Sequence, residues 1–217
     1  MPVTLPSIRQ AATTFALCLA TGLCAAQGTP SPMAAPAAAA PPSVRLRGVV
    51  QSVTPEMMTI KERSGEVIPL VLSPKLVVNE VYPIALSDVK AGSYIGTAAM
   101  PQPDGTQRAI AVTVFPESAR GVAEGSYPFD LRPESTMTNA TVADVVAAPT
   151  GRTLQVRYKD GAKTIVVPPE APVVSFRPGD RSLLVPGASV SLSAQAIDGK
   201  PTAMRVNAGR DGFPLPY

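Results

Sequence analysis

The chain has 217 residues, of which 19 are lysine or arginine and 16 are aspartate or glutamate, so its net charge is +3, and it contains no histidine and no tryptophan. Without histidine, nucleophilic triads with an imidazole base and zinc sites built on imidazole are excluded in their usual form. Charges of both signs are interspersed, whereas nucleic-acid-binding proteins usually carry a clustered basic stripe with stacking aromatics, so we expect no nucleic-acid partner.

Residues 1–26 have the order of a secretory signal peptide. Arg9 is the one charged side chain among the first ten residues, and residues 11–26 are uncharged and end in the small pair Ala25-Ala26. This apolar run is shorter than the roughly 20 residues that a membrane-spanning helix needs. We predict cleavage after Ala26 and a periplasmic or secreted location, with no transmembrane segment beyond the signal; retention of the segment as an anchor is the alternative.

The segment after the signal peptide, residues 27–43, consists mainly of alanine, proline and serine. Such a composition cannot bury enough apolar surface to offset its ordering entropy, so we predict a disordered tether. Cys18 and Cys24 both lie within the signal segment. The mature protein is therefore predicted to have no thiol, disulfide or cysteine metal site, and we expect no cofactor.

The remaining sequence contains an internal repeat. Three blocks recur in the same order, and the offset falls by one residue from each block to the next, as single-residue changes in loops would produce. The matched blocks are residues 58–72 with 154–168, Gly92 with Gly187, and Asp104-Gly105 with Asp198-Gly199.

The repeat predicts a duplicated β-domain. In the first copy Met58 and Ile60 alternate with polar residues, which is the period of a strand with one buried face. Gly65 and Gly161 are predicted to supply the positive φ that a tight hairpin needs. Five short strands per copy, with a long connection between the third and fourth, suit a small OB-like barrel; a pair of small β-sandwiches is the alternative.

The predicted organisation is an all-β protein of two tandem five-stranded barrels. The first barrel is expected over 44–115 and the second over 139–209. An irregular linker over 116–138 would join them, and residues 210–217 would form a C-terminal tail. Tandem barrels of this kind would have separate sheets and separate cores.

The same pattern resembles a known family. The order of strand, SG or DG hairpin, strand, loop ending in glycine, strand, DG turn and strand is carried here by Ser64-Gly65, by SDVKAGSYIG (87–96) and by DGTQRAIAVTV (104–114). It resembles a family of exported bacterial OB-like β-barrels of unknown function. The resemblance covers both copies, although the second copy lacks the acidic residue before its VPGAS. It implies a fold and a compartment but no activity.

Catalytic and metal chemistry find little support in the residue pattern. Two carboxylates can act without a histidine, so a carboxylate-dependent hydrolase is one alternative. However, most acids here flank turns, where they usually cap and are solvated, and we predict no catalytic residue. Met57 and Met58 are adjacent and would face opposite sides of a strand, so they cannot chelate Cu(I) together. We predict no metal site, and a metal-handling accessory protein of the cell envelope is the other alternative.

The linker carries the candidate site. The stretch SYPFDLRPESTMTNATV (126–142), which begins in the linker and runs into the second barrel, differs from the tether because it contains aromatic and charged residues. Burying an aromatic ring offsets the ordering of several residues, so we predict a packed clasp at the seam between the barrels, formed by Tyr127, Phe129, Asp130 and Arg132. The rival prediction is a ligand or partner groove at that seam. The expected function is non-catalytic binding or scaffolding, with a small ligand or an envelope protein as the partner.

Overall fold

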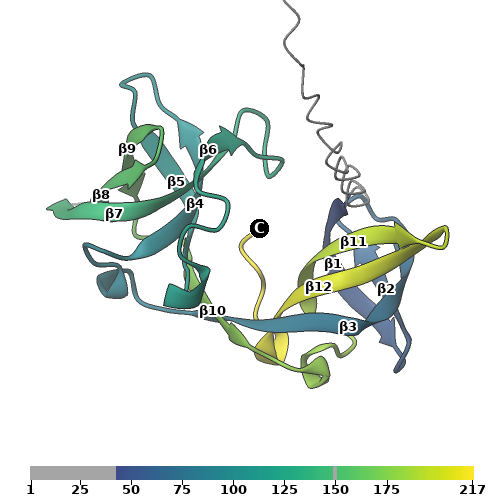
Figure 1. Cartoon of the computed structure of the whole chain (residues 1–217). Coiled ribbons are helices and arrows are strands. Elements are labelled where there is room, and N and C mark those ends of the chain that lie inside the picture. The colour runs from purple at the N-terminus through teal and green to yellow at the C-terminus, as the bar shows by residue number, and fades with distance from the viewer. Residues whose placement is uncertain (1–42, 149–150) are drawn as a thin grey trace, which may run out of the picture. The chain divides into compact units, whose positions relative to one another are not determined.

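The computed structural model describes residues 43–148 and 151–217, and strands are the main elements of this part of the chain (Figure 1). Within it there are twelve strands and four short 3-10 turns, so the protein is all-β, as predicted. The predicted signal peptide and all but the last residue of the predicted tether lie outside the described residues. No helix in the described ranges is long and apolar enough to cross a membrane.

Five strands close into a ring that we call barrel A. Their order is β12-β11-β1-β2-β3, and β3 pairs with β12 to close the ring. This closing pair is parallel, and the other four pairs are antiparallel. The strands of barrel A are β1 (Ser43–Val53), β2 (Met57–Glu62), β3 (Val67–Pro83), β11 (Ser189–Ile197) and β12 (Lys200–Gly209).

A second ring, barrel B, has the same arrangement of strand directions. Its order is β5-β4-β7-β8-β9, closed by a parallel pair between β5 and β9. A further short strand, β6 (Gly125–Pro128), pairs with β7 outside the ring. The strands of barrel B are β4 (Tyr94–Pro101), β5 (Gln107–Val114), β7 (Thr136–Ala148), β8 (Gly151–Tyr158) and β9 (Gly161–Val167).

The two barrels are nested in the sequence rather than tandem. The strands β4 and β5, expected in the first barrel, pair with β7 and β9 in barrel B, while β11 and β12 complete barrel A. Barrel B is therefore one continuous segment, residues 94–167, inserted between the two parts of barrel A. The expected linker, 116–138, lies inside barrel B instead of between the barrels.

The long strand β3 is the physical reason for this pairing. It runs for 17 residues, and its second half leaves the β2 edge and pairs with β10 (Val173–Pro178). β10 in turn pairs in parallel with β5 (Figure 1). The chain is thus carried out of barrel A before β4 begins. All twelve strands belong to one hydrogen-bonded sheet, which also differs from the separate sheets expected of tandem barrels.

Each barrel nevertheless has its own hydrophobic core. Met58 and Ile60, both fully buried, belong to the core of barrel A, which confirms the predicted alternation. Leu154 belongs to the separate core of barrel B. The 3-10 turns η1 (Leu86–Asp88) and η3 (Arg181–Leu183) are followed by the buried residues Val89 and Leu184, which pack into cores B and A respectively.

The two barrels also share a bulge but differ in one hairpin. Ile110 and Met204, which are 94 residues apart as in the third block of the repeat, are each the extra residue where a strand pair shifts register, β4–β5 in barrel B and β11–β12 in barrel A. Gly65 has a φ of +94°, as predicted. Gly161 has no positive φ, because Tyr158 pairs with it directly and places it within β9; the prediction for this glycine is wrong.

Candidate functional site

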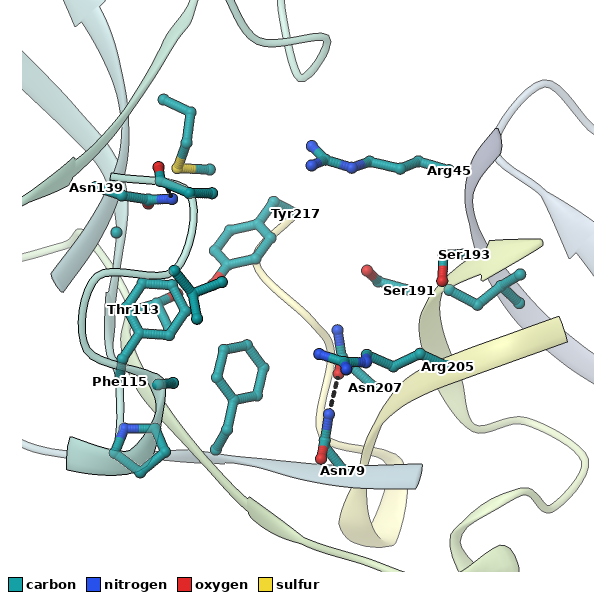
Figure 2. A pocket seen from close by; sticks show the side chains of 18 of the residues that line it. Arg45, Asn79, Thr113, Phe115, Asn139, Ser191, Ser193, Arg205, Asn207 and Tyr217 are labelled. Atoms are coloured by element: carbon teal, nitrogen blue, oxygen red, sulfur yellow. Dashed lines mark hydrogen bonds between the residues drawn. The ribbon is translucent and has the colours of Figure 1, made fainter. Parts of the chain in front are cut away.

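A cleft of about 470 Å³ opens between outer faces of the two barrels (Figure 2). Strands β1, β11 and β12 of barrel A form one side, which we call wall A. Strands β4, β5 and β7 of barrel B, together with the segment 115–129, form the opposite side, wall B. The volume lies within the range of about 300–1,000 Å³ that is usual for small-molecule sites.

Wall A is a polar surface built by strand register. Residues in register on neighbouring strands point to the same face of a sheet. Two rows cross β1, β11 and β12 in this way and line the cleft: Arg45–Ser193–Arg205 and Arg47–Ser191–Asn207. From β3, the Asn79 Nδ2 donates a hydrogen bond to Asn207 Oδ1 at 2.9 Å and extends the second row.

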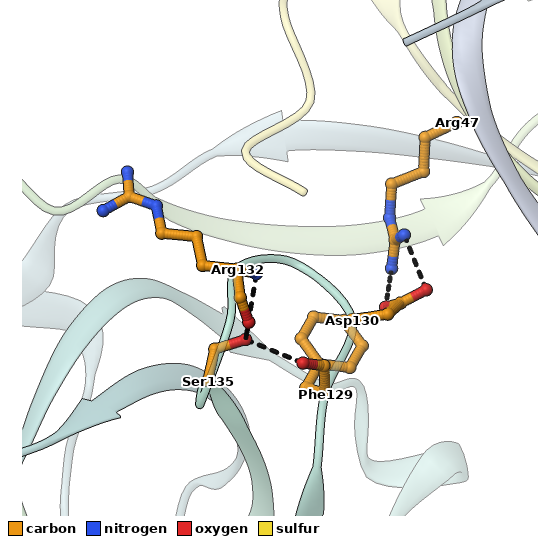
Figure 3. A network of polar contacts seen from close by, with 5 residues as sticks. All are labelled: Arg47, Phe129, Asp130, Arg132 and Ser135. Atoms are coloured by element: carbon orange, nitrogen blue, oxygen red, sulfur yellow. Dashed lines mark hydrogen bonds and ion pairs between the residues drawn. The ribbon is translucent and has the colours of Figure 1, made fainter. Parts of the chain in front are cut away.

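An ion pair between Arg47 of wall A and Asp130 of the inserted segment joins the two sides of the cleft. Both terminal nitrogens of Arg47 donate to the carboxylate of Asp130, at 3.0 and 2.7 Å (Figure 3). These hydrogen bonds lower the pKa of Asp130. The Arg47 guanidinium also lies 5.2 Å from the centre of the Phe129 ring, a cation–π distance. Arg45 lies over the same ring at 5.9 Å.

Wall B contains two buried oxygens without a partner. Asn139 is 5% exposed, and its Nδ2 donates to the Ala123 carbonyl and to the Tyr127 hydroxyl, at 3.0 and 3.1 Å. Among the described residues, Asn139 Oδ1 and Thr113 Oγ1 have no hydrogen-bond partner, although both side chains line the cleft. A buried polar atom left unsatisfied costs about 1–3 kcal/mol, so each such atom needs an explanation.

Gly96 allows this part of wall B to pack. A Cβ atom at Gly96 would lie 2.7 Å from Asn139 Oδ1 and 2.9 Å from a ring carbon of Phe115, which is closer than such contacts occur. The Phe115 ring packs between Tyr94, at 5.5 Å, and Phe176, at 6.0 Å between ring centres. Wall B therefore presents an aromatic surface beside the unpartnered amide oxygen.

The segment that completes wall B is fastened to barrel B. The Tyr94 hydroxyl donates to the Val122 carbonyl at 2.9 Å, and Arg120 Nη2 donates to the Gly92 carbonyl at 2.9 Å. Ala123 has a φ of +50°, which is uncommon for a residue with a side chain, and its carbonyl accepts the bond from Asn139. This part of the predicted linker is thus a packed piece of barrel B.

The four residues predicted at the seam fall into two groups. Tyr127 and Phe129 line the cleft, and Asp130 joins wall A through Arg47. Arg132 does not line the cleft: its backbone N–H donates to Ser135 Oγ, which itself donates to the Phe129 carbonyl (Figure 3). The Arg132 side chain makes no ion pair with another described residue.

The sequence-based prediction missed the partners that these residues meet. Arg45 and Arg47 lie on β1, over 75 residues before Tyr127 in the chain. Asn139 and Thr113 are expected from the sequence only as parts of the two barrels. The one available indication was the Arg-x-Arg spacing at 45–47, which places both arginines on one face of a strand. Within the described ranges, no three His, Cys, Asp or Glu side chains gather as a metal site.

Comparison with protein-family models, curated proteins and solved structures gives no match for this chain. The function must therefore be argued from the cleft itself, and the resemblance to exported OB-like barrels stays a prediction.

Proposed function

We propose that this protein is a non-catalytic binding protein of the periplasm or the secreted fraction, and that its ligand site is the cleft between barrels A and B. The observation that carries the proposal is the pair of buried, unpartnered oxygens of Asn139 and Thr113 on the wall of that cleft. A ligand that displaces the side chains covering these oxygens would satisfy both atoms and remove their desolvation cost. Interfaces between domains are also common places for small-molecule sites.

The charges around the cleft favour binding over catalysis. No aspartate or glutamate is among the described residues that line it. Asp130 and Glu80, which are adjacent in sequence to the lining residues Phe129 and Asn79, are held by arginines: Asp130 pairs with Arg47, and Glu80 pairs with Arg177 and Arg210. Both carboxyl groups have a lowered pKa because of these hydrogen bonds, so they are poor proton donors near neutral pH.

Two matched threonines provide the test of this site. Thr113 and Thr97 both carry a buried hydroxyl without a partner among the described residues, but only Thr113 lines the cleft. Small organic molecules are screened by the NMR shifts of the Asn139 side-chain amide and the Gly96 backbone amide. Thr113→Val is expected to weaken binding of the molecules that move these signals, whereas Thr97→Val leaves their affinity unchanged.

Both valine variants should keep or raise the melting temperature of the free protein, because each replaces an unpartnered hydroxyl by a methyl group. Ligands that bind equally well to both variants, or that shift no signal in the cleft, would refute the proposed site.

The proposed location in the periplasm or the secreted fraction has its own test. Mass spectrometry of the protein from an envelope fraction should give an N-terminus near Gln27, and a full-length cytoplasmic product would contradict export.

A further inference from the structure

Wall A carries positive charge that the surrounding acids do not balance. Arg47 is paired with Asp130 and Arg177 with Glu80. Arg45 and Arg205 also line the cleft, and neither makes an ion pair or a side-chain hydrogen bond to another residue in the described part of the chain. An anion that enters the cleft would therefore meet two guanidinium groups that no described aspartate or glutamate pairs with.

The register of the strands shows how these two arginines can share one anion. Arg45 pairs with Ser193 on β11, and Ser193 pairs with Arg205 on β12. The arginines are two strands apart, which sets their Cα atoms about 10 Å from one another. Both side chains extend into the cleft from wall A (Figure 2). A planar guanidinium matches the geometry of a carboxylate, so two of them can hold it from opposite sides.

Wall B already accepts a phenol ring of the protein itself. Tyr217 lies in the cleft with its ring directed toward the side of Phe115 and Asn139 (Figure 2). Burial raises the pKa of its hydroxyl group. Phe115 and Phe176, 6.0 Å apart between ring centres, add an aromatic surface that favours another ring. The space beside wall B thus has the shape and polarity for an aromatic group.

The amide of Asn139 determines what that aromatic group should carry. Its Nδ2 already donates two hydrogen bonds, to Ala123 and Tyr127, so the orientation of the amide is fixed. The atom left over is Oδ1, which can only accept. Thr113, two strands away on β5 and in register through Gly96, adds a hydroxyl that can accept or donate. A ligand hydroxyl would satisfy this end of the cleft.

We infer that the ligand is a small hydroxylated aromatic acid. Its acid group would lie between Arg45 and Arg205, its ring beside Phe115 in the space that Tyr217 now occupies, and its hydroxyl would donate to Asn139 Oδ1. This inference rests on the proposed function, because it names the class of ligand for the same cleft.

The test compares three probes that differ by one group each. Isothermal titration calorimetry of the mature chain is done with 4-hydroxycinnamate, with cinnamate, which lacks the hydroxyl, and with 4-hydroxycinnamyl alcohol, which lacks the charge. The hydroxylated acid is expected to bind most tightly. Loss of a charged hydrogen-bonding group should weaken binding about tenfold, so the alcohol should bind about tenfold more weakly.

Variants assign each group of the probe to its wall. The double variant Arg45→Ala/Arg205→Ala should weaken binding of both acids about tenfold or more and leave the alcohol unchanged. Thr113→Val should weaken only the two hydroxylated probes. The control is Arg157→Ala, an exposed arginine on β8 that does not line the cleft, and it should change nothing.

The possible failures separate the ligand class from the proposed function. If neutral aromatic molecules shift the Asn139 and Gly96 signals but the acid gains no affinity over the alcohol, the ligand class is wrong and the binding cleft stands. The same holds if the arginine double variant binds the acids normally. If no small molecule of any class shifts those signals, both the ligand class and the proposed function are overturned.

Discussion

Barrels A and B share their strand order and their directions, yet of the described strand residues with which they line the cleft, charged ones occur only in barrel A. In barrel A the row across β1, β11 and β12 is Arg47–Ser191–Asn207. The row in the same position of barrel B, across β7, β4 and β5, is Asn139–Gly96–Thr113. Pairing thus fixes which positions face the cleft, and the residue at each position decides the chemistry of that wall.

The largest effect should come from dividing the chain. Because barrel B is a continuous segment with its own core, residues 84–172 alone should fold and melt cooperatively. Residues 43–115, which cover the barrel expected from the sequence over 44–115, should stay unfolded because β1–β3 lack β11 and β12. Circular dichroism and NMR of the two fragments provide the measurement. A cooperatively melting 43–115 fragment would contradict the nested pairing.

A smaller effect compares one position on the two walls. Gly96→Ala places a methyl group against Asn139 and Phe115, and such overpacking should cost about 1–3 kcal/mol. Ser191→Ala changes the equivalent position of wall A, which is open to the cleft, and should stay within about 0.5 kcal/mol. Urea unfolding of both variants measures the difference. Equal costs would mean that the two walls are packed alike.

Acid should weaken the junction between the barrels through Glu80. This carboxylate is 3% exposed, and hydrogen bonds from Arg210 and Arg177 lower its pKa from 4.5 to about 2. A lowered pKa adds stability that is present above the ordinary value, so that stability should be lost as the pH falls from 4.5 toward 2. Melting temperatures across this range check it. Glu80→Gln should be less stable at neutral pH and should lose part of the dependence.

The smallest effect should come from the ion pair between the barrels. Asp130 is 58% exposed in its side chain, so Asp130→Asn should cost no more than about 1 kcal/mol, with a smaller cost in high salt. Glu170→Gln, which breaks the exposed pair with Arg108, is the matched control and should have almost no effect. Urea unfolding at low and high salt measures both. A cost for Asp130→Asn that does not depend on salt would show that the charge is not its cause.

Local features of the fold could be predicted from the sequence, but the partners of the strands could not. The alternation at Met58 and Ile60 reports burial directly, because a strand has two faces. Both copies of the repeat have the same pattern, so β4 and β5 suit either barrel equally well. Their choice depends on how far β3 continues beyond Leu72, and Pro74, a residue that usually marks the end of a central strand, lies inside β3 here.

The candidate site could likewise be predicted only in part. Tyr127 and Phe129 stand out because aromatic rings are unusual in a connecting segment. Arg47 and Asn139 do not stand out, because each is an ordinary polar residue in a strand, and only the three-dimensional fold sets them around one cleft. Thr113 became notable only when its burial left a hydroxyl without a partner among the described residues.

The insertion of barrel B also sets the order in which the chain can fold as it emerges from its N-terminus, whether from a ribosome or from an export channel. Strands β1–β3 emerge first, yet their partners β11 and β12 emerge last. Barrel B can close before barrel A. Until β11 and β12 arrive, Ile60 and Leu70 are exposed to solvent, although both are fully buried in the finished protein. In that interval the N-terminal strands are a target for chaperones and proteases, whereas barrel B is already protected.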